Sequence, residues 1–181
     1  MKKIYFLAIA ALVSFSACNK DIKSFANVDE DIPYHEEVDV PIGSSIAIPL
    51  PIVLDSSQYY AFATNFQSYL SQYNTSSEKV ISVKLKELTL KITNPANGNL
   101  NFIDSIAVYV VNNGQEKLAG YKAIANGLQS VDLTLTNEDY KQEFLQDSVH
   151  VKLRGFLSEI PVSGTKIDVS TVFHLLANPL N

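Results

Sequence analysis

The sequence predicts an all-β fold, an antiparallel, immunoglobulin-like β-sandwich of about seven or eight strands with one or two short helical insertions. Apolar and polar residues alternate in short segments from Val38 to Leu176, as expected where one face of each strand is buried. Gly, Pro and Asn residues separate these segments, and helical spacing occurs in two short stretches. Many short strands with few helices favour a sandwich.

The first residues contain the features of an export signal in the usual order. Lys2 and Lys3 precede an apolar run from Ile4 to Val13, and the small residues Ser16 and Ala17 precede Cys18, the single cysteine. The apolar run is shorter than the roughly 20 residues that a membrane-spanning helix needs. We therefore expect residues 1–17 to be a signal peptide and not a transmembrane helix.

The stretch "VSFSACNK" resembles the lipobox of bacterial lipoproteins, and the resemblance covers about the first 20 residues. Phe15 departs from the aliphatic residue usual at its position. The resemblance implies cleavage before Cys18, a diacylglycerol on the Cys18 thiol and an acyl chain, such as palmitate, on its amino group. Two or three acyl chains hold a protein firmly on a membrane. The alternative is an ordinary secreted protein, cleaved after Ala17, with a free thiol.

Lipoproteins that resemble this one in lacking an aspartate after the cysteine are commonly sorted to the outer membrane, and Asn19 fits that pattern. The resemblance thus implies a lipid-anchored protein in the envelope of a Gram-negative bacterium. Without Lys2 and Lys3, 12 of the 14 basic residues stand against 19 acidic ones, a formal charge of −7. Such a surface repels phosphate groups and anionic head groups, so we expect no nucleic-acid partner and no direct electrostatic binding to the membrane. The partners expected of an envelope lipoprotein are the membrane, through the lipid anchor, and an envelope protein.

An acidic, polar segment follows the cysteine. We expect residues 18–35 to form a flexible tether, because a segment of this composition cannot offset its ordering entropy, and residues 36–181 to form a single sandwich domain. A calcium site is the alternative for the acidic residues, but their spacing lacks the alternating ligands and the glycine of a calcium loop.

The domain begins with two alternating runs, Val38–Ile42 and Ile46–Leu54, which predict strands. Because Pro49 and Pro51 cannot donate to a ladder, we expect the second strand at a sheet edge.

The spacing changes to that of a helix at residues 57–73, where aromatic residues recur every three or four positions, and Asn74 is expected to end the helix. The aromatic stripe either packs on the sandwich as part of its core or forms a platform for a glycan or peptide ligand. The contact residues would then be Tyr59, Phe62, Phe66 and Tyr69, and their exposure to solvent distinguishes the two interpretations.

The strongest strand signal runs from Val80 to Asn94. Its apolar positions change parity between Leu85 and Leu88, which predicts a β-bulge near Lys86 and Glu87. A further strand through Ile106, Val108 and Val110 ends at a hairpin turn, Asn112-Asn113-Gly114, and is expected to return over Leu118–Ala123.

The last third repeats this pattern. Val131 to Leu135 predicts a strand, and the next stretch predicts a helical turn that buries Tyr140 and Phe144. The segments Val149–Phe156 and Lys166–Leu176 flank the turn "PVSGT" and are predicted to pair as a hairpin.

That hairpin would set His150 opposite His174, which makes them a weak candidate pair for a metal and otherwise ordinary surface residues. The sequence contains no glycine-rich phosphate loop, nucleophile elbow or His-Glu-x-x-His motif. We therefore expect no cofactor and no enzymatic activity; catalysis by two converging carboxylates is the alternative, and no pair stands out.

From Val80 onward the chain resembles small, functionally uncharacterised β-sandwich lipoproteins of Gram-negative bacteria, through "LKELTLKITNPANGNLNFIDSIAVYVVNNGQ" and the closing "FHLLANPL". It is more distantly similar to plant desiccation-related β-sandwich domains, which share a strand ending in an Asn-Pro loop. Both resemblances imply structural or binding duties. We expect a non-enzymatic, envelope-anchored interaction or accessory module, and the alternative is a glycan- or peptide-binding lipoprotein that uses the aromatic helix.

Overall fold

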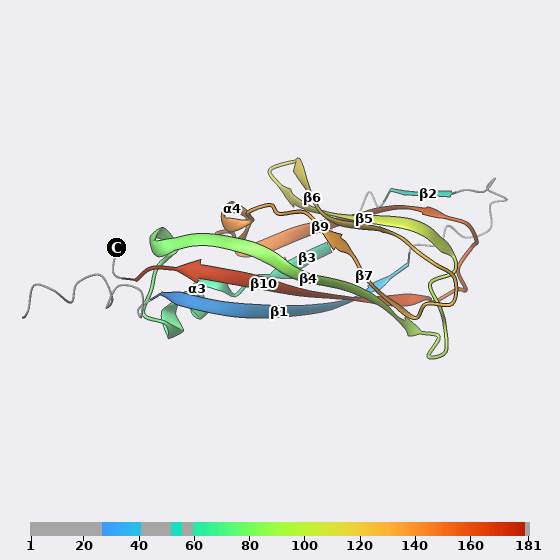
Figure 1. The fold of residues 1–181 in the computed structure, drawn as a ribbon, viewed down its shortest axis with the longest axis horizontal. Helices are drawn as coiled ribbons and strands as arrows, with labels where there is room; N and C mark the ends of the chain where they lie inside the picture. Colours follow the sequence, from blue (N-terminus) through green and yellow to red (C-terminus); the bar gives the residue numbers. More distant parts are fainter. Residues whose placement is uncertain (1–26, 41–51, 56–59, 180–181) are drawn as a thin grey trace, which may run out of the picture.

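The computed structural model describes residues 27–40, 52–55 and 60–179, which form two antiparallel sheets packed against each other (Figure 1). This arrangement confirms the predicted all-β sandwich. Sheet A has the strand order β1-β10-β4-β7. Its strands are β1 (Val28–Asp39), β4 (Val80–Asn94), β7 (Ser130–Asp132) and β10 (Lys166–Ala177).

Sheet B has the strand order β2-β9-β5-β6-β8, and β3 pairs with β9 as well. Its strands are β2 (Ile52–Asp55), β3 (Tyr60–Ala63), β5 (Ile103–Asn112), β6 (Gln115–Ala123), β8 (Thr134–Leu135) and β9 (Ser148–Leu157). The described residues thus contain ten strands and not the seven or eight predicted. Strand β2 lies at the edge of sheet B, as predicted for the run that ends at Leu54; the part of that run before Ile52 lies outside the described residues.

Strand β1 corrects the predicted tether. Residues 28–35, assigned to the tether, lie in β1, which pairs with β10 along its whole length, from Val28 opposite Ala177 to Asp39 opposite Lys166. Val28, Ile32 and Val38 are buried on one face of the strand, while four acidic side chains, Asp29, Asp31, Glu37 and Asp39, lie on the outward face. The acidic average composition of residues 28–35 therefore led to the tether prediction, although the segment is a strand. Residues 18–26 of the predicted tether lie outside the described residues.

The prediction of a helix over residues 57–73 is wrong for the first half of that range. Residues 60–63 form β3, which pairs with β9, and residues 57–59 lie outside the described residues. The backbone of Asn65 is left-handed, with φ of 49°, so no helix passes through it. Helix α3 (Phe66–Gln72) follows, and Asn74, with φ of 50°, stands just past its end as predicted.

The bulge and the first hairpin are confirmed. Between β10 and β4, Val172 faces Glu87 whereas Phe173 faces Leu85, so Lys86 is the extra residue. In the hairpin, Asn112 pairs with Gln115 across a two-residue turn. Both turn residues, Asn113 and Gly114, have positive φ, as a turn matched to the twist of the strands requires.

The strand predicted from Val131 to Leu135 is divided between the two sheets. Strand β7 pairs with β4 in sheet A and β8 pairs with β6 in sheet B, and Leu133 between them is buried. The predicted helical turn is confirmed as α4 (Lys141–Phe144), which buries Tyr140 and Phe144. A short 3₁₀ turn, Ser77–Lys79, precedes β4.

Strands β9 and β10 do not form the predicted hairpin. Strand β9 belongs to sheet B, between β5 on one side and β2 and β3 on the other, and β10 belongs to sheet A, between β1 and β4. The connection that contains "PVSGT" therefore crosses from one sheet to the other. Alternation identified both strands correctly but could not identify their partners.

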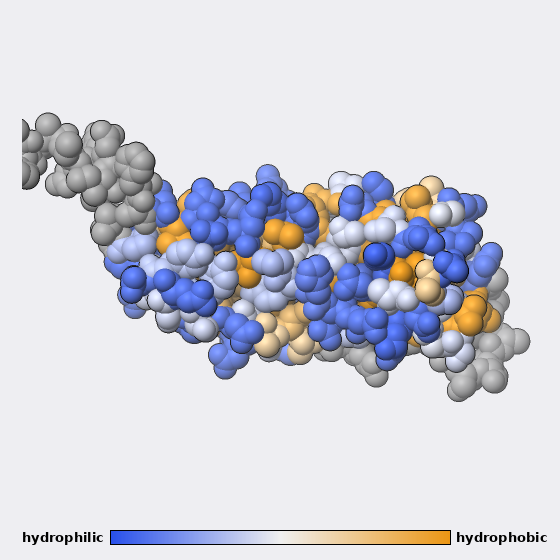
Figure 2. All heavy atoms as spheres, turned by 90° about the horizontal axis from the view of Figure 1, so that it is seen from below, coloured by the Kyte–Doolittle hydropathy of each residue, from blue (hydrophilic) through white to orange (hydrophobic). Residues whose placement is uncertain are grey.

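Aromatic rings fill one end of the core between the sheets. Phe144 of α4 and Phe173 of β10 have ring centroids 4.4 Å apart, and Tyr34, Phe66 and Tyr140 pack edge-on around them. Figure 2 shows one side of the molecule, where hydrophilic side chains cover most of the surface and hydrophobic ones form small separate patches. Within the described ranges, no helix is both long and apolar enough to cross a membrane.

Candidate functional site

The aromatic residues predicted as a ligand platform belong mostly to the core. Phe66 is only 1% exposed, and Phe62 and Tyr69 are partly buried against the core. Tyr59 lies outside the described residues. Because the two interpretations were to be separated by exposure, the buried positions favour the core interpretation for this stripe.

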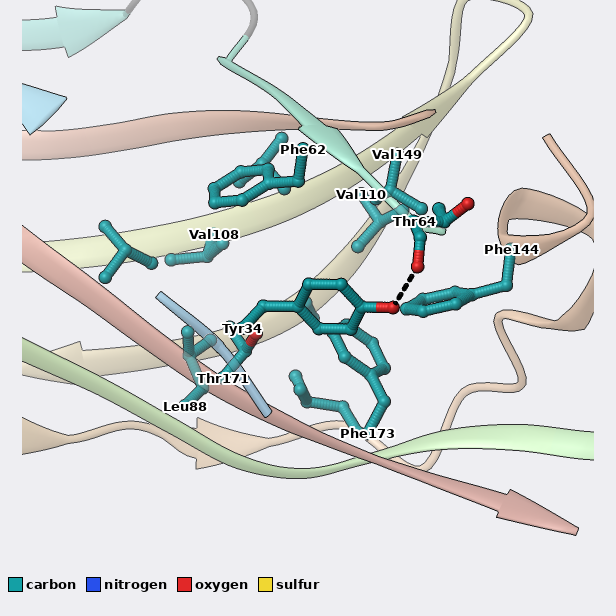
Figure 3. A pocket seen from close by; sticks show the side chains of 14 residues that line it. Tyr34, Phe62, Thr64, Leu88, Val108, Val110, Phe144, Val149, Thr171 and Phe173 are labelled. Carbon is teal, nitrogen blue, oxygen red and sulfur yellow. Dashed lines mark hydrogen bonds between the residues drawn. The ribbon is translucent and has the colours of Figure 1, made fainter. Parts of the chain in front are cut away.

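A small cavity lies between the sheets beside these residues (Figure 3). The hydroxyl of Tyr34 donates a hydrogen bond to the Thr64 carbonyl oxygen, 2.7 Å away, and Phe62 lies across the cavity from this bond. Burial, assisted by the neighbouring Tyr69, raises the pKa of Tyr34 from 10.0 to about 12. The cavity has a volume of about 30 Å³, which suits one water molecule at most, so it is a packing gap and not a ligand site.

The two histidines of the candidate metal pair lie on different sheets. His174 of β10 contacts two carboxylates of β1, with its Nε2 3.4 Å from Asp29 and its Nδ1 3.1 Å from Asp31. His150 of β9 stands opposite Ala61 and Val111. The predicted opposition of the histidines is therefore wrong, because it depended on the β9–β10 hairpin. No three His, Cys, Asp or Glu side chains among the described residues lie close enough together to hold a metal ion.

A serine, a histidine and an aspartate meet on the outer face of sheet A. The Ser170 hydroxyl donates to the Asp168 carboxylate at 2.5 Å, and the Nδ1 of His35 lies 2.9 Å from the same hydroxyl. In a catalytic triad the histidine stands between the serine and the acid and takes the serine's proton. Here the serine stands in the middle and His35 is exposed, so the cluster is a surface hydrogen-bond chain.

An exposed concavity lies on the outer face of sheet B. It has a volume of about 510 Å³ and runs over β5, between β6 and β9. Inward residues of β5 such as Ile106 and Val108 are buried, so Ser105, Ala107 and Tyr109 face outward. We call this concavity the β5 groove; it is lined by Ser105, Ile106, Ala107, Tyr109, Tyr121, Lys122, Ala123, Arg154, Gly155 and Phe156.

Strand register explains the shape of the β5 groove. Ala107 faces Tyr121 of β6 on one side and Arg154 of β9 on the other, and Ser105 faces Ala123 and Phe156. Directly opposed residues point to the same face. Small side chains therefore form the floor, while Tyr121 and Phe156, 51% and 49% exposed, stand on either side of it. Because Tyr121 is in register with Ala107 and Phe156 with Ser105, the two walls are offset by two residues along β5. With strands about 4.8 Å apart and a rise of about 3.4 Å per residue, their backbone positions lie about 12 Å apart on the diagonal.

Gly155 of β9 stands opposite the inward-facing Ile106, where β9 and β5 approach each other closely. A Cβ atom at this position would lie 2.4 Å from the backbone oxygen of Ser105, closer than real Cβ atoms approach. Only glycine permits this close approach of β9 to β5 without a shift of one backbone.

A charged network holds one end of the β5 groove. The guanidinium of Arg154 contacts the Glu116 carboxylate through Nη1 at 2.7 Å and Nη2 at 3.1 Å, and it lies 5.0 Å from the centre of the Tyr109 ring. Lys152, largely buried, places its Nζ 3.2 Å from the same carboxylate. Bidentate pairing and stacking on a ring orient a guanidinium. Glu116 thus pairs with both Arg154 and Lys152 at this end of the groove.

Sequence reasoning assigned the strands that carry the β5 groove but missed the groove itself. The alternation already placed Ser105 and Ala107 outward, and Tyr121 and Phe156 also occupy polar-face positions. Their approach depends on the β5–β9 pairing, which replaced the predicted β9–β10 hairpin. Cys18 lies outside the described residues. Comparison of the chain with family models, with curated proteins and with solved structures finds no match.

Proposed function

We propose that this chain is a non-enzymatic lipoprotein of the Gram-negative envelope, anchored through Cys18 in the outer membrane, whose sandwich is an interaction module that binds a neutral glycan in the β5 groove. The anchor rests on the lipobox resemblance, which covers Ser16, Ala17 and Cys18 after a short apolar run. The glycan assignment rests on the groove. The two parts are independent and have separate tests.

A single observation carries the binding proposal: two exposed aromatic side chains, Tyr121 and Phe156, stand on opposite sides of a floor of small residues, diagonally across β5. Large apolar side chains that gather at the surface of a soluble domain mark an interaction site more often than scattered ones do. The backbone positions of Tyr121 and Phe156 are about 12 Å apart on the diagonal, which leaves room for one six-membered ring between the two side chains. Pyranose rings present C–H groups on their faces and hydroxyls at their edges, and the groove offers aromatic faces beside polar groups such as Ser105.

The pairing of β5 favours a glycan over a peptide. Strand β5 is paired with β6 on one side and with β9 on the other, so its backbone groups are already used in ladders. A peptide in the groove could not add to the sheet and would gain no backbone ladder with β5. A glycan keeps its outer hydroxyls in water. The Arg154 guanidinium is bonded to Glu116 and lies against the Tyr109 ring, so the proposed contacts to the glycan are made by ring faces and hydroxyls and need no charge on the ligand.

Affinity electrophoresis of the full-length protein tests the glycan. We expect a gel that contains a soluble neutral polysaccharide, chosen from starch, mixed-linkage β-glucan, mannan and xylan, to retard the wild type. Phe156→Ala and Tyr121→Ala should each abolish most of the retardation, because each removes one wall. Ile160→Ala, which truncates another exposed apolar residue, is the matched control and should migrate like the wild type. Absence of retardation by all four polysaccharides, or equal retardation of the wall variants, would refute the proposal.

The anchor has its own test. Intact mass spectrometry of the chain isolated from membranes should show a mature form that begins at Cys18 and carries acyl chains. Cys18→Ser should remove the acyl mass and move the protein out of the membrane fraction, because the remaining chain has no lipid to hold it. An unmodified wild-type thiol would overturn the anchor without affecting the β5 groove.

A further inference from the structure

The two ends of the β5 groove are built from side chains of different size. The floor consists of Ser105 and Ala107, which are outward residues of the first half of β5. The next outward residue along the strand is Tyr109, which also lines the groove. The floor of small residues is therefore only two outward positions long, with Cα atoms about 7 Å apart, before it meets an aromatic side chain.

Charged side chains packed around Tyr109 close this end of the groove. The Arg154 guanidinium lies 5.0 Å from the centre of the Tyr109 ring and is bonded to Glu116. Lys152, directly opposite Tyr109 on β9, is only 8% exposed although it belongs to the outer face of the sheet. A lysine on an outer face is this strongly buried only where neighbouring side chains cover it. The groove accordingly has no lining residue beyond Tyr109 on β5.

The opposite end of the groove is not closed in this way. Among the described residues, the lining ends there at Ser105, Ala123 and Phe156, and Ser105 is in register with the other two. Two of these three side chains are small. Ala123 and the residue before Ser105, Asp104, are both exposed. A ligand chain held in the groove therefore leaves it past Ser105.

The shape of a sugar chain makes this difference between the ends important. In a chain of pyranoses linked through opposite ring positions, the two linkages of an internal residue leave in opposite directions. For a ring held between Tyr121 and Phe156, the floor blocks a linkage that points toward the sheet, and Tyr109 blocks one that points along β5 toward the closed end. One linkage at most has a free path, and a terminal residue has only one.

From this geometry we infer that the β5 groove binds the end of a glycan chain and excludes internal segments, with Tyr109 as the residue that excludes them. The inference rests on the glycan binding proposed for the groove. The room for one six-membered ring between Tyr121 and Phe156 agrees with the binding of a single terminal residue. The ligand class is therefore a chain end, and a longer chain gains no further binding positions.

Competition by oligosaccharides of two lengths tests the inference. The probes are unbranched oligosaccharides of about 3 and about 30 sugar residues, prepared by partial hydrolysis of whichever of the four polysaccharides retards the full-length wild type. Each is mixed with the protein before affinity electrophoresis, and the molar concentration that relieves half of the retardation is measured. We expect the two molar concentrations to agree within about twofold, because each molecule offers one binding end whatever its length.

A groove that accepts internal segments gives a different result. The longer oligosaccharide would then act at a molar concentration about tenfold lower, because it offers about ten times as many residues to bind. That outcome would overturn the inference but leave the glycan proposal intact. Absence of retardation by all four polysaccharides would refute the glycan proposal, and this inference with it.

Variants of Tyr109 locate the closed end. Tyr109→Ala removes the side chain at which the floor ends, so we expect the longer oligosaccharide to act at a concentration about tenfold lower than the shorter one. Tyr109→Phe keeps the ring and is the matched control, which should show no dependence on length. Equal values in Tyr109→Ala, or a length dependence in Tyr109→Phe, would contradict the role of Tyr109. The comparison of lengths on the wild type remains decisive if Tyr109→Ala does not fold.

Discussion

Replacing Tyr34 with phenylalanine removes a single hydroxyl from the edge of the core while keeping the ring. The Tyr34 hydroxyl donates to the Thr64 carbonyl oxygen at 2.7 Å and so connects β1 of sheet A to the segment after β3 of sheet B. A hydrogen bond of this kind contributes about 1 kcal/mol to the free energy of unfolding. At neutral pH we therefore expect Tyr34→Phe to lower the melting temperature by about 2 to 4 °C.

The same hydroxyl makes the effect depend on pH. The pKa of Tyr34 is about 12 in the folded state, raised by burial from the ordinary value of 10.0. Between these values the unfolded chain has released the proton that the folded chain keeps, so the free energy of unfolding falls as the pH rises. At pH 11 the loss is about 1.4 kcal/mol, one pH unit's worth. Because the variant lacks this loss, its stability should meet that of the wild type at about pH 11.

Urea unfolding, followed by circular dichroism at intervals from pH 8 to pH 11, measures both effects. Tyr121→Phe is the matched control, since it removes an exposed hydroxyl and should change the free energy of unfolding by less than about 0.5 kcal/mol at neutral pH. A constant difference between the wild type and Tyr34→Phe across this range would refute the reasoning, because it would mean that Tyr34 ionises as readily in the folded chain as in the unfolded one.

Two further substitutions test the packing around the site. Gly155→Ala should cost about 2 kcal/mol, because its Cβ would lie 2.4 Å from the Ser105 oxygen and force β9 away from β5; an unchanged urea midpoint would contradict this contact. Asp139→Ala should cost about 1 to 2 kcal/mol, because Oδ1 of Asp139 accepts from the backbone N–H groups of both Val83 and Lys141, each at 3.0 Å. Asp139→Asn keeps an acceptor and should retain most of this stability in the same urea titration; a loss as large as that of alanine would show that the hydrogen bonds are not responsible.

Features set by neighbouring residues were predictable from the sequence. The bulge at Lys86 follows from the parity change between Leu85 and Leu88, which a regular strand cannot bury on one face. The turn at Asn113 and Gly114 follows from residues that tolerate positive φ. Both depend on backbone geometry within a few residues.

The errors arose where a segment's structure depends on distant partners. The segment that begins at Val28 looked like a tether by composition, yet it is ordered by β10, about 140 residues away in the chain. Residues 60–63 have helical spacing of aromatic residues, yet they form a strand because β9 offers an open edge beside them. In both cases pairing with a distant strand outweighed the structure that the local sequence favours.

The candidate site shows the same division. The outward positions of Ser105 and Tyr121 were implied by alternation and by the predicted hairpin. The β5–β6 part of the β5 groove could therefore be predicted from the sequence. Phe156 and Arg154 joined it only through the β5–β9 pairing.

By itself, the sequence determined that the chain forms mostly strands, which side chains of most strands face inward, and where several turns lie, because period-two alternation and turn residues act through the local backbone. The tertiary structure alone decided which strands pair, where the chain crosses between the sheets after β7 and β9, and therefore which side chains meet on the outer face of sheet B. Alternation specifies the face of a strand that is buried, but it carries no information on the neighbouring strand, which is chosen by packing over the whole domain.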